Sequence, residues 1–132
     1  MTIAQHSAIT DLAHADDRSA TWWTAVARAL DELDERLALD ALEDDGPQGA
    51  FGASVGRAPS LANEVTRLRA DRKRLIERAR RLRRVVAMVA GDPTQIPPVT
   101  GELEVLAAAE GRYRERSRAV FWDSFTRDIG GE

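Results

Sequence analysis

The segment that decides the fold is PSLANEVTRLRADRKRLIERARRLRRVVAMVA, residues 59–90. Apolar or small side chains, with one arginine among them, recur along it at alternating spacings of four and three residues: Leu61, Val65, Leu68, Arg72, Leu75, Ala79, Leu82, Val86 and Val89. This spacing is typical of a helix that packs along its whole length against other helices. We therefore expect one long helix over 59–90 with a continuous apolar seam.

The rest of this segment is strongly cationic. Nine arginines and Lys73 lie between Arg67 and Arg84, against two acids. On a helical wheel these bases occupy nearly all the polar positions and do not form one stripe. The predicted charged face of the helix consists of Arg72, Arg74, Arg78, Arg80, Arg81 and Arg84.

Arg72 falls on the seam itself, where a buried guanidinium without a partner would be very costly. It must either extend past the rim of the core or pair with a carboxylate. In an antiparallel hairpin the middles of neighbouring helices meet. The acids expected within its reach are Asp31, Asp34 and Glu35.

Two further long helices are expected on either side of this one. The apolar positions Trp23, Val26, Leu30, Leu33 and Leu37 predict a helix over about residues 18–43. The same spacing reaches back to Ile9, so two starts are open: near Thr10, or after a short polar cap at Asp16, Asp17 or Ser19.

A third helix is expected over about residues 100–129, after an extended, proline-stiffened connection, with Thr100 as its cap. Its apolar stripe is Leu103, Leu106, Tyr113, Val120, Phe121, Phe125 and Ile129. No segment shows the sustained alternation of a strand. We predict an all-α fold, an antiparallel three-helix bundle with long coiled-coil-like helices, in one domain over 18–132. Residues 1–17 would form a mobile or partly helical N-terminal arm.

The glycine-rich connection over residues 46–58 is the least ordinary stretch. Phe51 and Val55 are four residues apart, which favours a short helical turn on the end of the bundle. A phosphate-cradling loop is the alternative, but such loops follow a strand, and no strand is visible. The sequence leaves open whether this stretch is structural or contacts a ligand.

Charge is distributed unevenly along the 132 residues, although the net charge is only -3. Residues 1–58 hold eleven acids and four bases, whereas residues 59–90 hold three acids and ten bases. We expect the acidic first helix and the basic second helix to neutralise each other, with an external anionic partner as the alternative. The absence of cysteine excludes disulfides and thiol chemistry.

Little in the sequence supports a catalytic, cofactor or metal site. The two histidines, His6 and His14, lie in the N-terminal arm, away from any nucleophile with a third orienting group. Asp11, His14 and Asp17 could share a helical face, but bundle metal sites draw ligands from several helices. No stretch approaches the roughly 18 apolar residues of a membrane span, so we expect a cytoplasmic protein without membrane contacts.

Exposed aromatic side chains are the best candidates for an interface. Trp22 and Trp23 lie about 100° apart on a helix, so we expect Trp22 to be partly exposed while Trp23 is buried. Trp22, Trp122 and Phe125 could anchor a contact, since tryptophan is enriched in binding hot spots. The alternative is that these aromatics cap the two ends of the bundle.

These observations favour a non-enzymatic helical interaction or regulatory protein, an adaptor, that forms a homodimer and binds an unidentified protein partner. One alternative is a nucleic-acid-binding protein that uses the arginine-rich helix 67–84. Overall acidity and the scattered bases weigh against it. A second alternative is a helical ligand-binding or enzyme-accessory bundle.

Overall fold

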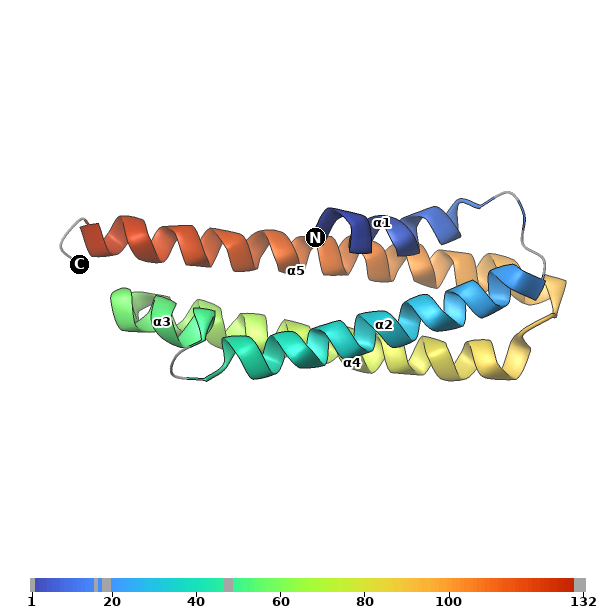
Figure 1. The fold of residues 1–132 in the computed structure, drawn as a ribbon, viewed down its shortest axis with the longest axis horizontal. Helices are drawn as coiled ribbons and strands as arrows, with labels where there is room; N and C mark the ends of the chain where they lie inside the picture. The colour runs from blue at the N-terminus through green and yellow to red at the C-terminus, as the bar shows by residue number, and fades with distance from the viewer. Residues whose placement is uncertain (1, 16, 18–19, 47–48, 130–132) are drawn as a thin grey trace.

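A computed structural model describes residues 2–15, 17, 20–46 and 49–129. Its three long helices are α2 (Ala20–Asp44), α4 (Ala62–Val89) and α5 (Ile96–Ile129). The shorter elements are α1 (Thr2–Ala13), α3 (Ala50–Arg57), and two 3-10 turns, η1 (Pro59–Leu61) and η2 (Pro93–Gln95). The long helices lie side by side and alternate in direction along the chain (Figure 1). The predicted all-α antiparallel three-helix bundle is confirmed.

The predicted seams form the core of this bundle. Every seam position of the basic helix from Leu61 to Val86 is buried, and Val89 is half-buried. The predicted apolar positions of α2 are buried as well, from Trp23 to Leu37. Continuous burial along both helices explains why a segment so rich in arginine is nevertheless a core helix.

The two short helices pack against different parts of α5. α1 packs against α5 and α2, with Ile9 and Ala13 buried. α3 packs against α5 nearer its C-terminal end, and Phe51 is buried there (Figure 1). The predicted N-terminal arm therefore contributes a helix to the core. The predicted helical turn in the glycine-rich connection is confirmed, and its role at Phe51 is structural.

The start of α5 differs from the expected one. Asp92 accepts hydrogen bonds from the Thr94 amide at 3.0 Å and the Thr94 hydroxyl at 2.7 Å, and so begins the η2 turn. Pro97 and Pro98 then lie in the first turn of α5, where the missing amide hydrogens cost little. The expected extended connection and the cap at Thr100 were wrong.

The start of α2 at Ala20 supports the later of the two predicted starts, because α1 ends separately at Ala13. Of the candidate caps, Asp16 and Ser19 lie outside the described residues. The end of α4 agrees with the prediction. The helix ends at Val89, and Gly91 follows with a φ of +90°, in the left-handed region that glycine tolerates.

Trp22 is buried, contrary to the expectation that its ring is partly exposed. Only 3% of Trp22 is exposed, and its indole Nε1 donates a hydrogen bond to the Leu12 carbonyl of α1 at 2.8 Å. The expectation assumed three helices, whereas α1 supplies a fourth surface that covers this ring. The two tryptophan rings make an edge contact with centroids 4.9 Å apart.

Candidate functional site: a cationic groove between α4 and α5

Three ion pairs neutralise the side of α4 that faces α2. Arg83 lies 3.1 Å from Asp31, Arg80 lies 2.8 Å from Asp34, and Arg69 lies 3.1 Å from Asp45. Each pair follows the antiparallel register, in which residues early in α2 meet residues late in α4. The expected neutralisation between the acidic and basic helices is confirmed along this side.

Arg72 pairs with a different acid from those expected. Its side chain is buried, and its Nη2 donates a hydrogen bond to Asp45 Oδ2. The same register explains the correction: Asp31 and Asp34 lie opposite Arg83 and Arg80, nearer the C-terminal end of α4. No ion pair between Arg72 and Glu35 is present in the described structure.

The neighbouring acids Asp44 and Asp45 differ in their ionisation. Burial acts to raise the pKa of Asp45, but hydrogen bonds and charge from Arg72 and Arg69 outweigh it and lower the pKa below its usual value. Burial and the charge of Asp40 raise the pKa of Asp44. One carboxyl is therefore stabilised in its charged form and its neighbour in its neutral form.

A buried polar cluster joins α2 to α5, and sequence reasoning missed it. Glu110 is 1% exposed and accepts hydrogen bonds from Arg36 at 3.3 Å and Arg114 at 3.4 Å. Arg114 also donates to Asp40. Glu110 lies between Leu106 and Tyr113 at the spacing of the apolar stripe, which was the signal available in the sequence.

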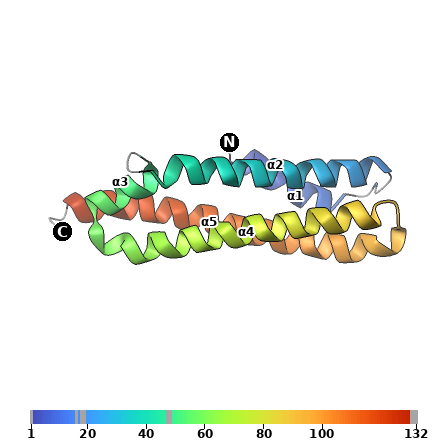
Figure 2. The same ribbon diagram turned by 90° about the horizontal axis from the view of Figure 1, so that it is seen from below.

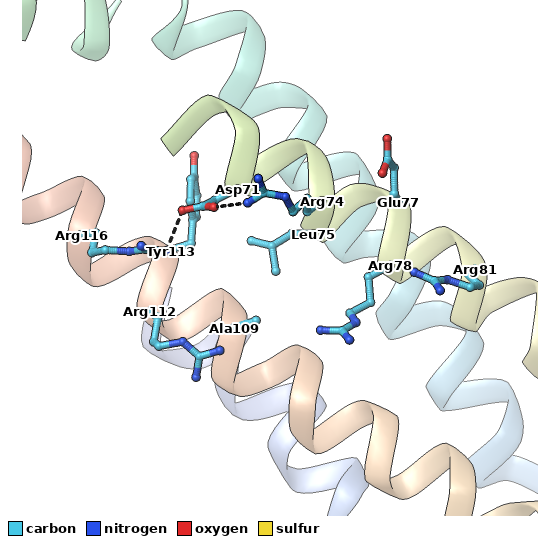
Figure 3. A pocket seen from close by; sticks show the side chains of 10 residues that line it. All are labelled: Asp71, Arg74, Leu75, Glu77, Arg78, Arg81, Ala109, Arg112, Tyr113 and Arg116. Carbon is cyan, nitrogen blue, oxygen red and sulfur yellow. Dashed lines mark hydrogen bonds and ion pairs between the residues drawn. The ribbon is translucent and has the colours of Figure 1, made fainter. Parts of the chain in front are cut away.

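A cavity lies on the opposite side of α4, between α4 and α5 (Figure 3). We call it the cationic groove; its volume is about 360 Å³. Its lining comprises five arginines, two acids and three other residues: Arg74, Arg78, Arg81, Arg112, Arg116, Asp71, Glu77, Leu75, Ala109 and Tyr113. The formal charge of the lining is +3, from five bases and two acids.

The charge of the groove is only partly compensated. Asp71 accepts hydrogen bonds from Arg74 and from Arg116, each at 2.7 Å (Figure 3). Among the described residues, no ion pair involves Arg78, Arg81 or Arg112. These three guanidinium groups hold the uncompensated positive charge of the groove.

The groove continues into an apolar half. Arg78 and Arg81 also line a second hollow of about 260 Å³, towards the C-terminal end of α4. Its remaining lining is mostly apolar and consists of Leu82, Val85, Gln95, Pro98, Val99 and Glu102. We call this hollow the apolar half. The two hollows adjoin at Arg78 and Arg81, which line both, and we call the two together the trough.

The predicted charged face is thus divided among different environments. Arg74, Arg78 and Arg81 line the cationic groove, whereas Arg80 pairs with Asp34. Arg72 is buried, and Arg84 lies outside the groove, beside the α2–α4 contact. Sequence reasoning missed two arginines of the groove, both on α5. Their spacing, Arg112 and Arg116, places them one turn apart on one face, but only the packed structure shows that this face adjoins α4.

The remaining predicted interface residues gather near the C-terminal end of α5. Trp122 is 65% exposed, and Phe121 and Phe125 contact it and each other. The Arg57 guanidinium of α3 lies 3.8 Å from the Phe125 ring centroid. We call Phe121, Trp122 and Phe125 the aromatic end. The C-terminal end of α5 and the N-terminal end of α2, which holds Trp22, lie at opposite ends of the bundle (Figure 1).

The described part of the chain shows no arrangement of side chains suited to holding a metal ion. Nδ1 of His14 lies 4.0 Å from Glu104, and no group of three or more potential metal ligands occurs among the described residues. None of the described helices is long and apolar enough to cross a membrane. The groove offers guanidinium donors and an apolar floor, a combination suited to holding an anionic group.

Comparison with known proteins gives no relative: no family model, no curated protein and no solved structure matches the chain.

Proposed function

We propose that this protein is a non-enzymatic interaction module that binds an acidic segment of a protein partner in the cationic groove. The observation that carries the proposal is the contrast between the two sides of α4. On the α2 side, Arg69, Arg80 and Arg83 have carboxylate partners. On the α5 side, Arg78, Arg81 and Arg112 gather around one cavity without any ion pair in the described structure.

Several like charges on one face repel each other, and an anion between them relieves that repulsion. Arginine is well suited to this task because its planar guanidinium presents a fork of donors that matches a carboxylate. Asp71 already binds arginines of the groove in this way: its carboxylate accepts hydrogen bonds from Arg74 of α4 and Arg116 of α5. A carboxylate from a partner would do the same for the remaining arginines.

Features of the lining favour a protein over a nucleic acid. Asp71 and Glu77 repel a phosphate backbone and an acidic peptide alike, so the apolar half is the feature that discriminates: it offers no cation beyond Arg78 and Arg81. The chain as a whole carries a net charge of -3, which disfavours long-range attraction to nucleic acid. An acidic protein segment with apolar side chains fits both halves of the trough.

We also propose that the protein forms a homodimer through the aromatic end. Trp122 is 65% exposed, and large aromatic side chains are typical anchors of protein interfaces. Trp22 is no longer a candidate, because α1 covers it. The two proposals concern different surfaces and can be tested separately.

The test of the groove uses two triple variants with the same change in charge. Arg78→Gln, Arg81→Gln and Arg112→Gln remove two groove arginines from α4 and one from α5. Lys73→Gln, Arg84→Gln and Arg118→Gln remove three exposed bases in the same distribution, outside the groove lining. Affinity for a glutamate-rich peptide would be measured by calorimetry at several salt concentrations.

The groove variant should bind the peptide roughly tenfold or more weakly, because three exposed pairs contribute about 0.5–1 kcal/mol each. The control variant should lose far less. Equal losses in both variants would contradict the proposal, because charge alone would then explain binding. Tighter binding to duplex DNA than to the peptide, with a steep salt dependence, would favour the nucleic-acid alternative.

A further inference from the structure

We infer that the occupant of the trough is an amphipathic helix of the partner. The face that this helix turns to the trough is acidic over one half of its length and apolar over the other half. The inference rests on the proposed function and specifies the partner further. The acidic half would lie between Arg78, Arg81 and Arg112. The apolar half would lie against Val85 and Pro98.

The walls of the trough have the periodicity of helix packing. On α4 the lining residues are Asp71, Arg74, Leu75, Glu77, Arg78, Arg81, Leu82 and Val85. Apart from Glu77 they recur at three- and four-residue spacings, and the lining of α5 shows the same spacings. Rows of side chains at these spacings form grooves into which the ridges of another helix fit.

An extended segment fits the trough less well. The backbone groups of α4 and α5 are paired within their own helices, so neither wall offers the open edge that an added strand needs. Recognition must therefore proceed through side chains. A helix presents side chains along one face at the spacing of the walls, whereas an extended segment alternates them between two faces.

The trough lies on a side of the bundle that is open in the described structure. All its lining residues belong to α4, η2 and α5. α1 packs against α2 and α5, on the side of the bundle away from α4 (Figure 2). A helix in the trough would add another long neighbour to α4 and α5 and give the packing of a four-helix bundle.

Length and polarity define the partner further. From Asp71 to Val85 the trough follows 15 residues of α4, whose 14 steps of 1.5 Å span about 21 Å. The occupant is thus a helix of about four turns. Its acids occupy two turns and its apolar residues the other two, because the cationic groove and the apolar half follow each other along α4.

Three designed peptides of identical composition test this inference. The first places glutamates in one half and leucines in the other half of a single helical face. The second distributes the same residues so that acids and leucines alternate along the face. Every peptide contains two prolines, which lie at the ends of the first and second peptides. The third peptide keeps the order of glutamates and leucines of the first but has both prolines at its centre, where they break the helix.

Binding would be measured by calorimetry, with circular dichroism to follow helix formation. We expect the first peptide to bind roughly tenfold more tightly than the other two and to gain helix on binding. Val85→Asp should weaken its binding, because Val85 lines the apolar half. Leu39→Asp, on an exposed apolar residue of α2, is the control and should leave binding unchanged.

The outcomes separate this inference from the proposed function. If all three peptides bind equally and all depend on the groove arginines, the groove recognises acidic segments of any shape, and the amphipathic helix is refuted. If none binds, the proposed function fails as well. If the groove triple variant converts a dimer into a monomer, the occupant is a second copy of this chain, which also refutes the inference.

Discussion

Asp71 of α4 accepts a hydrogen bond from Arg116 of α5 at 2.7 Å, and this contact spans the cationic groove near one end. The same carboxylate is bound by Arg74. Asp71 thus pairs with two of the five arginines of the groove, and a carboxylate of the partner would compete with Asp71 for these two arginines. The strength of this internal contact sets how much positive charge is available to a partner.

Removing this internal competitor should strengthen binding of acidic segments. Asp71→Asn raises the formal charge of the groove lining from +3 to +4. We expect affinity for a glutamate-rich peptide to rise about two- to fivefold, since an exposed charge pair contributes up to about 1 kcal/mol. A neutral glutamine-rich peptide is the control. Weaker binding to the glutamate-rich peptide would show that Asp71 positions the arginines instead of competing for them.

The long seam of the basic helix was predictable because it depends on residue spacing alone. Leu68, Leu75 and Leu82 are seven residues apart, and each is buried as expected. The groove could not be predicted in the same way. Arg112 adjoins the arginines of α4 only through the register between two helices distant in sequence, which spacing within one helix does not determine.

The failures at Trp22 and Arg72 have related causes. Trp22 is covered by α1, whose Leu12 carbonyl accepts the indole hydrogen bond, and the N-terminal arm shows no strong apolar period. For Arg72 the prediction of a carboxylate partner was right, but its identity depended on the register of α2 against α4. Asp45 could be identified only once both helices were in place.

The buried Glu110 should be essential only while its arginine partners remain. Glu110→Leu leaves Arg36 and Arg114 largely buried without this partner and should cost about 3 kcal/mol of unfolding free energy. Adding Arg36→Met and Arg114→Met removes both guanidinium groups but leaves Asp40 without its Arg114 partner, so it should restore only part of the lost stability. Chemical denaturation measures both. A triple variant less stable than Glu110→Leu alone would contradict this interpretation.

Asp44 and Asp45 should influence stability in opposite directions. The pKa of Asp45 is lowered on folding, so its charged form stabilises the fold above pH 4, and this contribution is lost as the pH falls through the folded pKa. The pKa of Asp44 is raised, so its charge disfavours the fold at neutral pH. At pH 7 we expect Asp45→Asn to destabilise the protein and Asp44→Asn to stabilise it.

Urea denaturation across the acid range tests this pair. The advantage of Asp44→Asn should vanish as the pH falls through the raised folded pKa of Asp44 to the ordinary aspartate value of about 3.9. The deficit of Asp45→Asn should persist to that value and shrink only below it, as the pH falls through the lowered folded pKa of Asp45. The two variants are matched controls, because they make the same substitution at adjacent positions. Equal effects of the same sign at pH 7 would contradict the assigned pKa directions.

Self-association should depend on Trp122 and not on Trp22. Trp122→Ala should convert a dimer at about micromolar concentration into a monomer, with little effect on monomer stability, because Trp122 is mostly exposed. Trp22→Ala should instead cost about 3–5 kcal/mol of stability as a core truncation. Sedimentation and denaturation separate these effects. A dimer that persists in Trp122→Ala would assign the contact to another surface.

The most direct test of binding in the cationic groove is thiol protection, which the absence of natural cysteine makes possible. Ala109→Cys places a thiol in the groove lining, and Ala108→Cys places one on the neighbouring exposed position outside it. With saturating glutamate-rich peptide, we predict that alkylation slows several-fold at position 109 and stays unchanged at position 108. Equal alkylation rates at position 109 with and without bound peptide would contradict binding in this groove.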